Sequence, residues 1–174
     1  MKHRIPMETE VKLRIPSTEA LLPLLAALDF KPSQPMQEEI SILWDRDGEL
    51  FAKGCALRLR RYAGTSTLTW KGPKQPDPEL KIRPEIETAI QDPEALEGIL
   101  NALGYAPVLH MVKRRATMHR AELLACLDET PFGIYLELEG DPQSIRLAME
   151  HLCLNSSHIE PRSYPTLFRE HGLG

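Results

Sequence analysis

Three charged side chains near the amino terminus alternate with uncharged ones. Glu8, Glu10 and Lys12 occupy every second position of the stretch METEVKL. Alternate residues of an extended strand share a face, so two carboxylates and an ammonium group would lie side by side. Carboxylate oxygens are ligands that Mg²⁺ prefers, and an ammonium group binds phosphate. The simplest interpretation is a solvated strand face, and the alternative is a site for a metal ion and a phosphate.

Charged side chains recur with the same spacing along the rest of the chain. The segments ALRLRR, TLTWK, LKIRPEIE, VKRRAT and IYLELE all alternate charged or polar with apolar residues, and ACLD precedes the last of them. This period of two predicts β-strands with one charged face. The charged members are Arg58, Arg60, Lys71, Lys81, Arg83, Glu85, Glu87, Lys113, Arg115, Asp128, Glu137 and Glu139.

Helical spacing replaces the alternation in three segments, residues 17–30, 92–104 and 141–154. Ser17 or Thr18 is a suitable cap for the first, while Asp92 and Asp141 precede a proline at the first helical position of the others. Each helix follows a Glu-x-Glu strand. The pattern predicts one α+β domain over residues 1–174, built on an antiparallel sheet.

Composition narrows the class of protein. The 174 residues carry a formal net charge of −4, which argues against general nucleic-acid binding. The three cysteines are scattered without metal-ligand spacing, which favours a reduced, cytoplasmic protein. The longest apolar stretch, ALLPLLAAL, is too short to span a bilayer, so no membrane partner is expected.

The charged faces have two interpretations. An antiparallel sheet can expose a charged face to water, and this arrangement explains the alternation without any functional site. These faces, however, consist mainly of Arg, Lys and Glu, with little of the Ser, Asn and Gln of an ordinary wet surface. If the sheet closes into a barrel, they line a lumen whose cations could surround a polyphosphate and whose glutamates could bind Mg²⁺ or Mn²⁺. Burying so many charges makes sense chiefly in a functional site.

The order of motifs resembles the CYTH superfamily, the triphosphate tunnel metalloenzymes, which include class IV adenylate cyclases and thiamine triphosphatases. ETEVK resembles the amino-terminal Glu-x-Glu-x-Lys signature of that family. The later segments WDRDGELFAKGCALRLR, LTWKGP, RPEIE, VKRR, LDETPFGIYLELEG and RSYPTLF resemble its successive strands and carboxy-terminal element. The resemblance implies an eight-stranded antiparallel β-barrel with a charged tunnel and helices packed outside.

The resemblance also implies roles for individual residues. Glu8, Glu10 and Lys12 would be catalytic, and Glu8, Glu10, Glu137 and Glu139 would bind the metal. Phosphates would be bound by Lys12, Arg58, Arg60, Lys71, Arg83, Lys113, Arg115 and Arg162, with Glu85, Glu87 and Asp128 as supporting acidic residues. Arg162 stands where the family has lysine. Lys81 is expected beyond the tunnel mouth, and Arg114 is expected to point away from the tunnel.

Two reactions could use such a tunnel. A triphosphatase would direct water at the terminal phosphorus of inorganic triphosphate, thiamine triphosphate or a nucleoside triphosphate, with Mg²⁺ or Mn²⁺ as cofactor. An adenylate cyclase would form cyclic AMP and pyrophosphate from ATP, and it would also need an adenine pocket, which the sequence does not identify. A noncatalytic polyphosphate-binding module is the third hypothesis. A small triphosphate compound is the expected partner, and the resemblance allows a homodimer.

Overall fold

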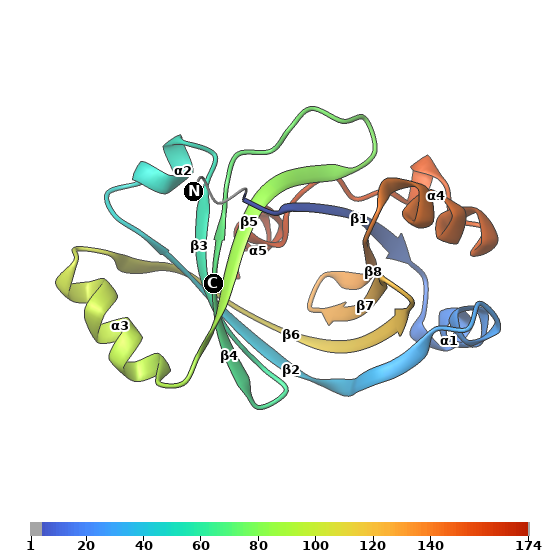
Figure 1. The fold of residues 1–174 in the computed structure, drawn as a ribbon, viewed down its shortest axis with the longest axis horizontal. Helices are drawn as coiled ribbons and strands as arrows, with labels where there is room; N and C mark the ends of the chain where they lie inside the picture. The colour runs from blue at the N-terminus through green and yellow to red at the C-terminus, as the bar shows by residue number, and fades with distance from the viewer. Residues whose placement is uncertain (1–4, 174) are drawn as a thin grey trace.

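Eight strands form one closed antiparallel barrel in the computed structural model, which describes residues 5–173. The order around the barrel is β1-β5-β4-β3-β2-β6-β7-β8 (Figure 1). The strands are β1 (Met7–Ile15), β2 (Lys31–Asp45), β3 (Ala56–Tyr62), β4 (Thr65–Lys71), β5 (Lys81–Ile90), β6 (Ala106–Arg120), β7 (Leu123–Thr130) and β8 (Gly133–Glu139). The predicted eight-stranded barrel is therefore confirmed.

The three helices that the sequence pattern predicts are present as α1 (Thr18–Ala27), α3 (Pro93–Ala102) and α4 (Pro142–His151). The structure adds α2 (Glu49–Ala52), α5 (Tyr164–Glu170) and a short 3₁₀ turn, η1 (Ser156–His158), which the spacing did not predict. Ser17, Asp92 and Asp141 cap α1, α3 and α4 by accepting hydrogen bonds from backbone N–H groups of the first turn. Among the described helices, none is both long and apolar enough to cross a membrane.

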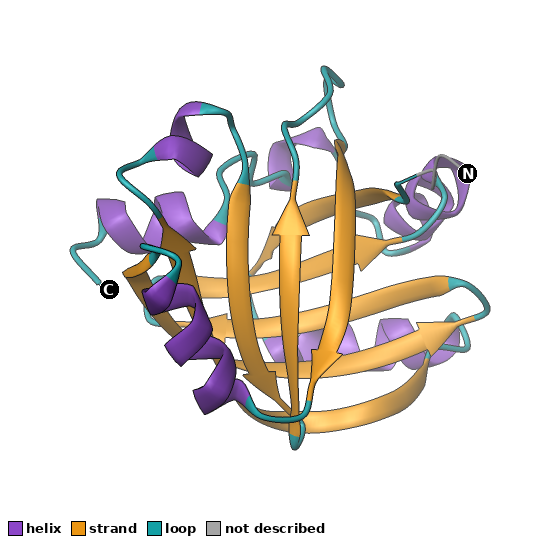
Figure 2. Cartoon of the chain, turned by 60° about the vertical axis from the view of Figure 1, so that its left-hand side comes forward, coloured by secondary structure: helices purple, strands orange, loops and turns teal. Residues whose placement is uncertain are grey.

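The apolar face of the barrel points outward and lies beneath helices. Val11 of β1 and Leu138 of β8 are fully buried in a cluster that includes Leu25 of α1 and Ile145 of α4. On another side, α3 covers Trp44 and Leu59, the latter in β3. Figure 2 shows the helices arranged around the outside of the strands. The core thus lies between the barrel and its helices, and the polar face of the strands is left to line the interior.

The carboxy-terminal helix α5 differs because it packs against the inward-facing side of β2 and β6. Phe168 of α5 is buried against Leu43 and Met111, and the register aligns Leu43 with Leu109. These apolar side chains share the inner faces of their strands with charged residues further along. Helix α5 therefore closes part of one end of the lumen.

Candidate active site

Strand register brings the charged faces together inside the barrel. Glu8 lies opposite Arg83, and Glu10 lies opposite Lys81 on one side and Glu139 on the other. Lys12 lies opposite Glu137 in β8. The same face continues through the pairs Lys71 with Glu85, Thr69 with Glu87, Arg58 with Thr69, Arg60 with Ser41, Glu39 with Lys113 and Arg115 with Asp128. Residues that are distant in sequence therefore line one lumen.

The lumen contains two cavities that share part of their lining. The larger, of about 560 Å³, is bordered by basic side chains that include Lys12, Lys81 and Lys113. The smaller, of about 290 Å³, is bordered by the carboxylates of Glu8, Glu85, Glu87 and Glu139, together with Arg60. The residues Glu10, Arg58, Lys71, Arg115 and Glu137 line both. A basic compartment thus adjoins an acidic one.

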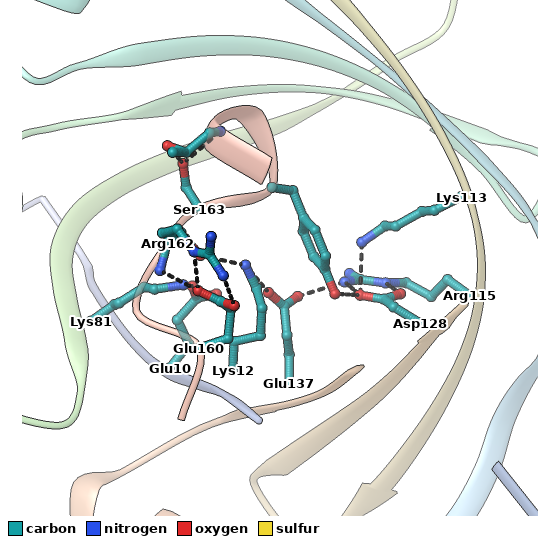
Figure 3. A network of polar contacts seen from close by, with 12 residues as sticks. Glu10, Lys12, Lys81, Lys113, Arg115, Asp128, Glu137, Glu160, Arg162 and Ser163 are labelled. Atoms are coloured by element: carbon teal, nitrogen blue, oxygen red, sulfur yellow. Dashed lines mark hydrogen bonds and ion pairs between the residues drawn. The ribbon is translucent and has the colours of Figure 1, made fainter. Parts of the chain in front are cut away.

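A buried ion-pair network orders the basic compartment. Arg115 Nη2 donates to Asp128 Oδ2 and to Glu137 Oε2, each at 2.6 Å. Lys113 Nζ donates to the same Asp128 oxygen at 2.8 Å. Figure 3 shows Asp128 beside Lys113 and Arg115. Asp128 has no exposed surface and lines neither cavity, so it holds the two cations from behind rather than facing the lumen.

Lys12 is nearly inaccessible to water, with 1% of its surface exposed. Its Nζ donates to the carbonyl oxygen of Arg162 at 2.9 Å and lies 3.8 Å from Glu137 Oε1. Burial lowers the pKa of Lys12 to about 7 although Glu137 opposes the shift. A bound phosphate would favour the charged form of this lysine.

The acidic compartment holds carboxylates that resist ionisation. Burial and a hydrogen bond with Glu85 raise the pKa of Glu8 to about 7, even though Lys71 Nζ lies 2.7 Å from Glu8 Oε1. Burial and the nearby Glu8 and Glu10 also raise the pKa of Glu139. Glu137 behaves in the opposite way, since Arg115 and the lysines overcome burial and hold its pKa far below the usual range. Burial is thus the main reason that Glu8 and Glu139 ionise less readily than ordinary carboxyl groups.

The four glutamates predicted to bind metal all line the smaller cavity. Their hard oxygen donors suit Mg²⁺ or Mn²⁺, and the mutual repulsion of Glu8, Glu10 and Glu139 would be relieved by a divalent cation. Within residues 5–173, no three His, Cys, Asp or Glu side chains already converge as a metal-binding group. Instead, Glu10 lies 3.4 Å from Lys81 and Glu137 pairs with Arg115. The glutamate oxygens are therefore suitable ligands for the metal ion, and two of the four carboxylates are paired with Lys81 and Arg115.

The remaining predicted phosphate ligands also face the lumen. Arg58 and Arg60 lie 3.6 and 3.3 Å from the Glu87 carboxylate, which also accepts a hydrogen bond from Thr69 at 2.7 Å. Lys71 Nζ is 2.7 Å from both Glu8 and Glu85 carboxylate oxygens. Arg83 lines the larger cavity, where its Nη2 donates to the carbonyl oxygen of Gly72 at 2.6 Å.

Two sequence-based expectations about placement differ from the structure. The Arg162 guanidinium lies outside both cavity linings and pairs with Glu160 and Glu170 at 2.6 and 2.9 Å, because these carboxylates flank it on the same carboxy-terminal segment. Lys81 was expected beyond the tunnel mouth but lines the larger cavity, since its register partner Glu10 draws it inward. Arg114 points away from the lumen as predicted and pairs with Glu129 at 2.7 Å.

Some lumen residues were missed by the sequence analysis. Glu39 is 2% exposed, and its carboxylate lies 3.5 Å from both Lys113 Nζ and Arg115 Nε. The signal was present, because Glu39 and Ser41 alternate with Ile40 and Ile42 in the segment QEEISILWD. Tyr164 was also missed as an individual residue, since nothing in the local pattern indicates that the start of α5 enters a barrel.

The larger cavity has an apolar end that the sequence did not indicate. Side chains of β2, α2, β6 and α5 border it, namely Leu43, Trp44, Leu50, Phe51, Val108, Met111 and Phe168. Trp44 is almost fully buried, and its indole Nε1 has no hydrogen-bond partner among the described residues. This end could accommodate an apolar or aromatic group next to the basic compartment.

Comparison with known proteins gives a family for this arrangement. A protein of Methanocaldococcus jannaschii, provisionally named an adenylate cyclase, is 31% identical over 134 residues, which cover 76% of each chain. A Vibrio parahaemolyticus structure with the same provisional name has a TM-score of 0.81 at 20% identity, covering 95% of this chain and 99% of that one. A Hippeastrum protein, provisionally an adenylyl cyclase and described as having dominant triphosphatase activity, has a TM-score of 0.70 at 21% identity, covering 94% and 96%.

The Vibrio parahaemolyticus and Hippeastrum structures share the overall fold of this chain. A match to a family model identifies the family. The CYTH domain family matches residues 6–158. This range includes all eight strands and the four glutamates Glu8, Glu10, Glu137 and Glu139 that line the smaller cavity. Because that match covers most of the chain, this protein belongs to the CYTH domain family.

Proposed function

We propose that this protein hydrolyses a triphosphate in the barrel lumen with the help of a divalent metal ion. The observation that supports this most strongly is the convergence of basic side chains from five strands on one cavity, next to an acidic one. Inward-pointing cations on so many strands have no structural use that neutral residues could not meet at lower cost. A polyanion that accepts several charge-assisted hydrogen bonds would stabilise them.

The basic compartment would hold the phosphate groups. Lys113 and Arg115 are fixed from behind by Asp128, so their remaining donors are oriented before the ligand arrives. Such preorganisation reduces the entropy lost on binding. Lys12 and Arg58 would contact the same chain of phosphates from the neighbouring strands, since both line the larger cavity.

The acidic compartment would hold Mg²⁺ or Mn²⁺ through Glu8, Glu10, Glu137 and Glu139. Bound there, the metal ion would offset the negative charge of the phosphate oxygens and polarise the phosphorus toward attack. Triphosphate binding would also draw Lys81 toward phosphate, which would free the Glu10 carboxylate that this lysine now contacts.

Glu8 would act as the general base. Its carboxylate lines the smaller cavity, where it can hold a water molecule by hydrogen bonding and accept a proton from it. A water oxygen would form a bond to the terminal phosphorus, its proton would pass to Glu8, and the bond from that phosphorus to the bridging oxygen would break. Cations in the basic compartment would stabilise the departing diphosphate.

A cyclase is the second candidate, and the apolar end of the larger cavity favours it. A base or another organic group could lie there against Leu43 and Phe168 while its phosphates reach Lys12 and Lys113. In that case the ribose 3′-hydroxyl of ATP would attack the α-phosphorus, and pyrophosphate would leave. Both reactions would use the same cations and carboxylates, so the products must separate them.

The test is product identification with purified protein and Mg²⁺ or Mn²⁺. Inorganic triphosphate, thiamine triphosphate and ATP are each incubated, and products are separated by chromatography. Release of orthophosphate from at least one substrate, with ADP rather than cyclic AMP from ATP, is the expected result, and chelation should stop it. Mainly cyclic AMP and pyrophosphate would establish the cyclase instead. Tight triphosphate binding without any product would point to a noncatalytic binding module.

Adjacent arginines on β3 provide a matched control for phosphate binding. Arg58→Ala and Arg60→Ala should each weaken binding of a nonhydrolysable triphosphate by about 10- to 100-fold, the effect of losing one charged hydrogen bond. Arg61 lies on the opposite face and pairs with Glu97 of α3 at 2.8 Å, so Arg61→Ala should leave binding unchanged. Titration calorimetry measures all three, and equal effects at positions 60 and 61 would contradict the proposal.

A further inference from the structure

The ring of Tyr164 lies against two lysines of the basic compartment. Lys12 Nζ is 3.8 Å from the ring centroid, and Lys113 Nζ is 4.1 Å from it. Both distances are well within the range in which an ammonium group is attracted to the negative face of an aromatic ring. The Tyr164 hydroxyl donates to Asp128 Oδ2 at 2.5 Å, the oxygen that also accepts from Lys113. One side chain thus contacts both lysines and the carboxylate behind them.

The backbone around Tyr164 fixes the position of this ring. The Lys12 carbonyl accepts a hydrogen bond from Glu160 N at 2.8 Å, and Lys12 Nζ donates to the Arg162 carbonyl. Ser163 caps α5, and Phe168 on the next turn is buried against Leu43 and Met111. The segment that carries Tyr164 is therefore attached to β1 on one side and packed inside the barrel on the other.

The chemistry of the ring suits a site that must later bind phosphate. Two ammonium groups in a desolvated compartment repel each other, and each has a carboxylate within reach, Glu137 for Lys12 and Asp128 for Lys113. A further carboxylate between them would compete with the phosphate oxygens. A neutral ring attracts both cations without neutralising them, so their charge stays available to a polyanion.

We propose that Tyr164 is a positioning residue that holds the Lys12 and Lys113 ammonium groups in place for the phosphates through the electrostatic attraction of its ring. The proposal rests on the function proposed above, because it takes a triphosphate as the ligand. Without this attraction, Lys12 would be held only by Glu137 and the Arg162 carbonyl, and Lys113 only by Asp128 and Glu39. The two ammonium groups would then be less firmly fixed in the position that faces the phosphates. Binding would therefore weaken although every cation remained.

The competing explanation is that Tyr164 only fills space. Its ring also packs against Tyr135, with centroids 5.8 Å apart and planes at 84°, and such contacts stabilise a fold by shape. Removing the side chain would not distinguish the two explanations, because a cavity would form in either case. The test must therefore alter the charge distribution of the ring and leave its size nearly constant.

Fluorinated phenylalanines at position 164 meet this requirement. Tyr164→Phe is the reference, and one to five fluorine atoms then reduce the negative potential of the ring face stepwise. For each protein, titration calorimetry gives the Kd for inorganic tripolyphosphate without metal, and melting gives Tm. From Phe to the fully fluorinated ring we expect Kd to rise stepwise by a total of about three- to thirtyfold, the range of one cation–π contact, with Tm nearly constant. Tyr164→Phe itself should bind close to wild type.

Kinetics provide a second readout. The lysines bind phosphate in the ground state as well as the transition state, so fluorination should raise KM and change kcat less than about twofold. The same series at Phe132 is the control. Phe132 packs edge-on against Phe168 at 5.1 Å between centroids and has no lysine over its ring among the described contacts, so its fluorination should leave Kd unchanged.

The outcomes separate the positioning role from the proposed reaction. A Kd that stays constant across the position-164 series, or a Tm that falls in parallel with binding, would show that the ring acts by packing and would overturn the inference. A stepwise rise in Kd without turnover of any triphosphate would support the inference and overturn the proposed hydrolysis alone. Wild-type protein that does not bind tripolyphosphate would overturn both.

Discussion

Glu39 illustrates how a single carboxylate stays ionised in the lumen. Burial opposes its ionisation, but Lys113 and Arg115 outweigh burial and hold its pKa at about 2. Ser41 Oγ also donates to this carboxylate at 3.3 Å. Because the cations are themselves buried, loss of the Glu39 charge would leave positive charge uncompensated in the interior.

We therefore expect Glu39→Gln to lower the free energy of unfolding at pH 7 by about 3 kcal/mol, the typical cost of breaking a buried ion pair. The folded-state pKa is below the unfolded value, so the contribution is fully present above the unfolded pKa and is lost as pH falls through about 2. Denaturant unfolding of both proteins should show the difference narrowing below about pH 4. Glu38→Gln, on the exposed face of β2, is the control. A difference that is equal at pH 7 and pH 3 would contradict this account.

Two neighbouring glutamates of β8 should respond in opposite ways to loss of charge. The pKa of Glu139 is raised by burial and by Glu8 and Glu10, so stability from its protonated form is lost as pH rises through that raised pKa. Glu139→Gln should therefore raise the Tm of the metal-free protein at neutral pH. Glu137 is ionised against Arg115, so Glu137→Gln should lower Tm.

Both glutamine variants should lose turnover if Glu137 and Glu139 bind the metal. Thermal melts with chelator, run beside activity assays, measure the two effects separately. Normal turnover in either variant would remove that residue from the proposed metal site. A lower Tm for both variants would show that relief of repulsion at Glu139 is smaller than the packing it provides.

At the scale of elements, the carboxy-terminal segment acts as a support for β1. The residues between η1 and α5 form a bridge from Ile159 to Leu13, and the Glu160 side chain accepts from the backbone N–H and the guanidinium of Arg162. A compact turn results, and its main-chain carbonyl rather than the arginine side chain faces Lys12.

Arg162→Gln should consequently leave triphosphate affinity within about threefold of wild type, because the Arg162 carbonyl remains. Stability should change little, since the Arg162 side chain is 45% exposed and its ion pairs are screened by solvent. Lys113→Met is the comparison, and it should weaken binding strongly. Titration calorimetry measures the affinity of each variant. A tenfold loss of affinity for Arg162→Gln would show that the Arg162 side chain does bind phosphate.

At the scale of the whole molecule, charge inside the barrel makes the folded state sensitive to ligands. The closed sheet encloses carboxylates and cations that repel their own kind, so ions that bind the lumen should stabilise the fold by mass action. A ligand at about 100 times its Kd adds about 2.7 kcal/mol to the free energy of unfolding.

We expect inorganic tripolyphosphate to raise Tm, and Mg²⁺ or Mn²⁺ together with tripolyphosphate to raise it further, with Ca²⁺ less effective because its longer bonds suit a larger site. Differential scanning calorimetry across ligand concentrations measures the shift. The double variant Arg58→Ala/Arg60→Ala should show a much smaller increase with tripolyphosphate. An equal increase in that variant would mean that the ligand binds outside the lumen.

Local sequence determined much of this fold because its rules act over a few residues. The pleat puts Glu8, Glu10 and Lys12 on one face of β1 wherever that strand lies. Ser17, Asp92 and Asp141 begin their helices by accepting bonds from the first turn, which requires no distant partner. The membership of each charged face was therefore predictable, apart from the overlooked alternation at Glu39 and Ser41 in β2.

Tertiary structure decided which face is enclosed and where the long side chains point. Closure of β1 against both β5 and β8 makes the charged side the interior, and alternation alone is equally consistent with a solvated face. Lys81 turns inward to Glu10, and Arg162 turns away to Glu160, because flexible cations follow the nearest carboxylate. Tyr164 reaches Lys12 across 152 positions of sequence only because the chain after η1 returns to β1. Such contacts depend on the path of the whole chain, which short-range patterns do not specify.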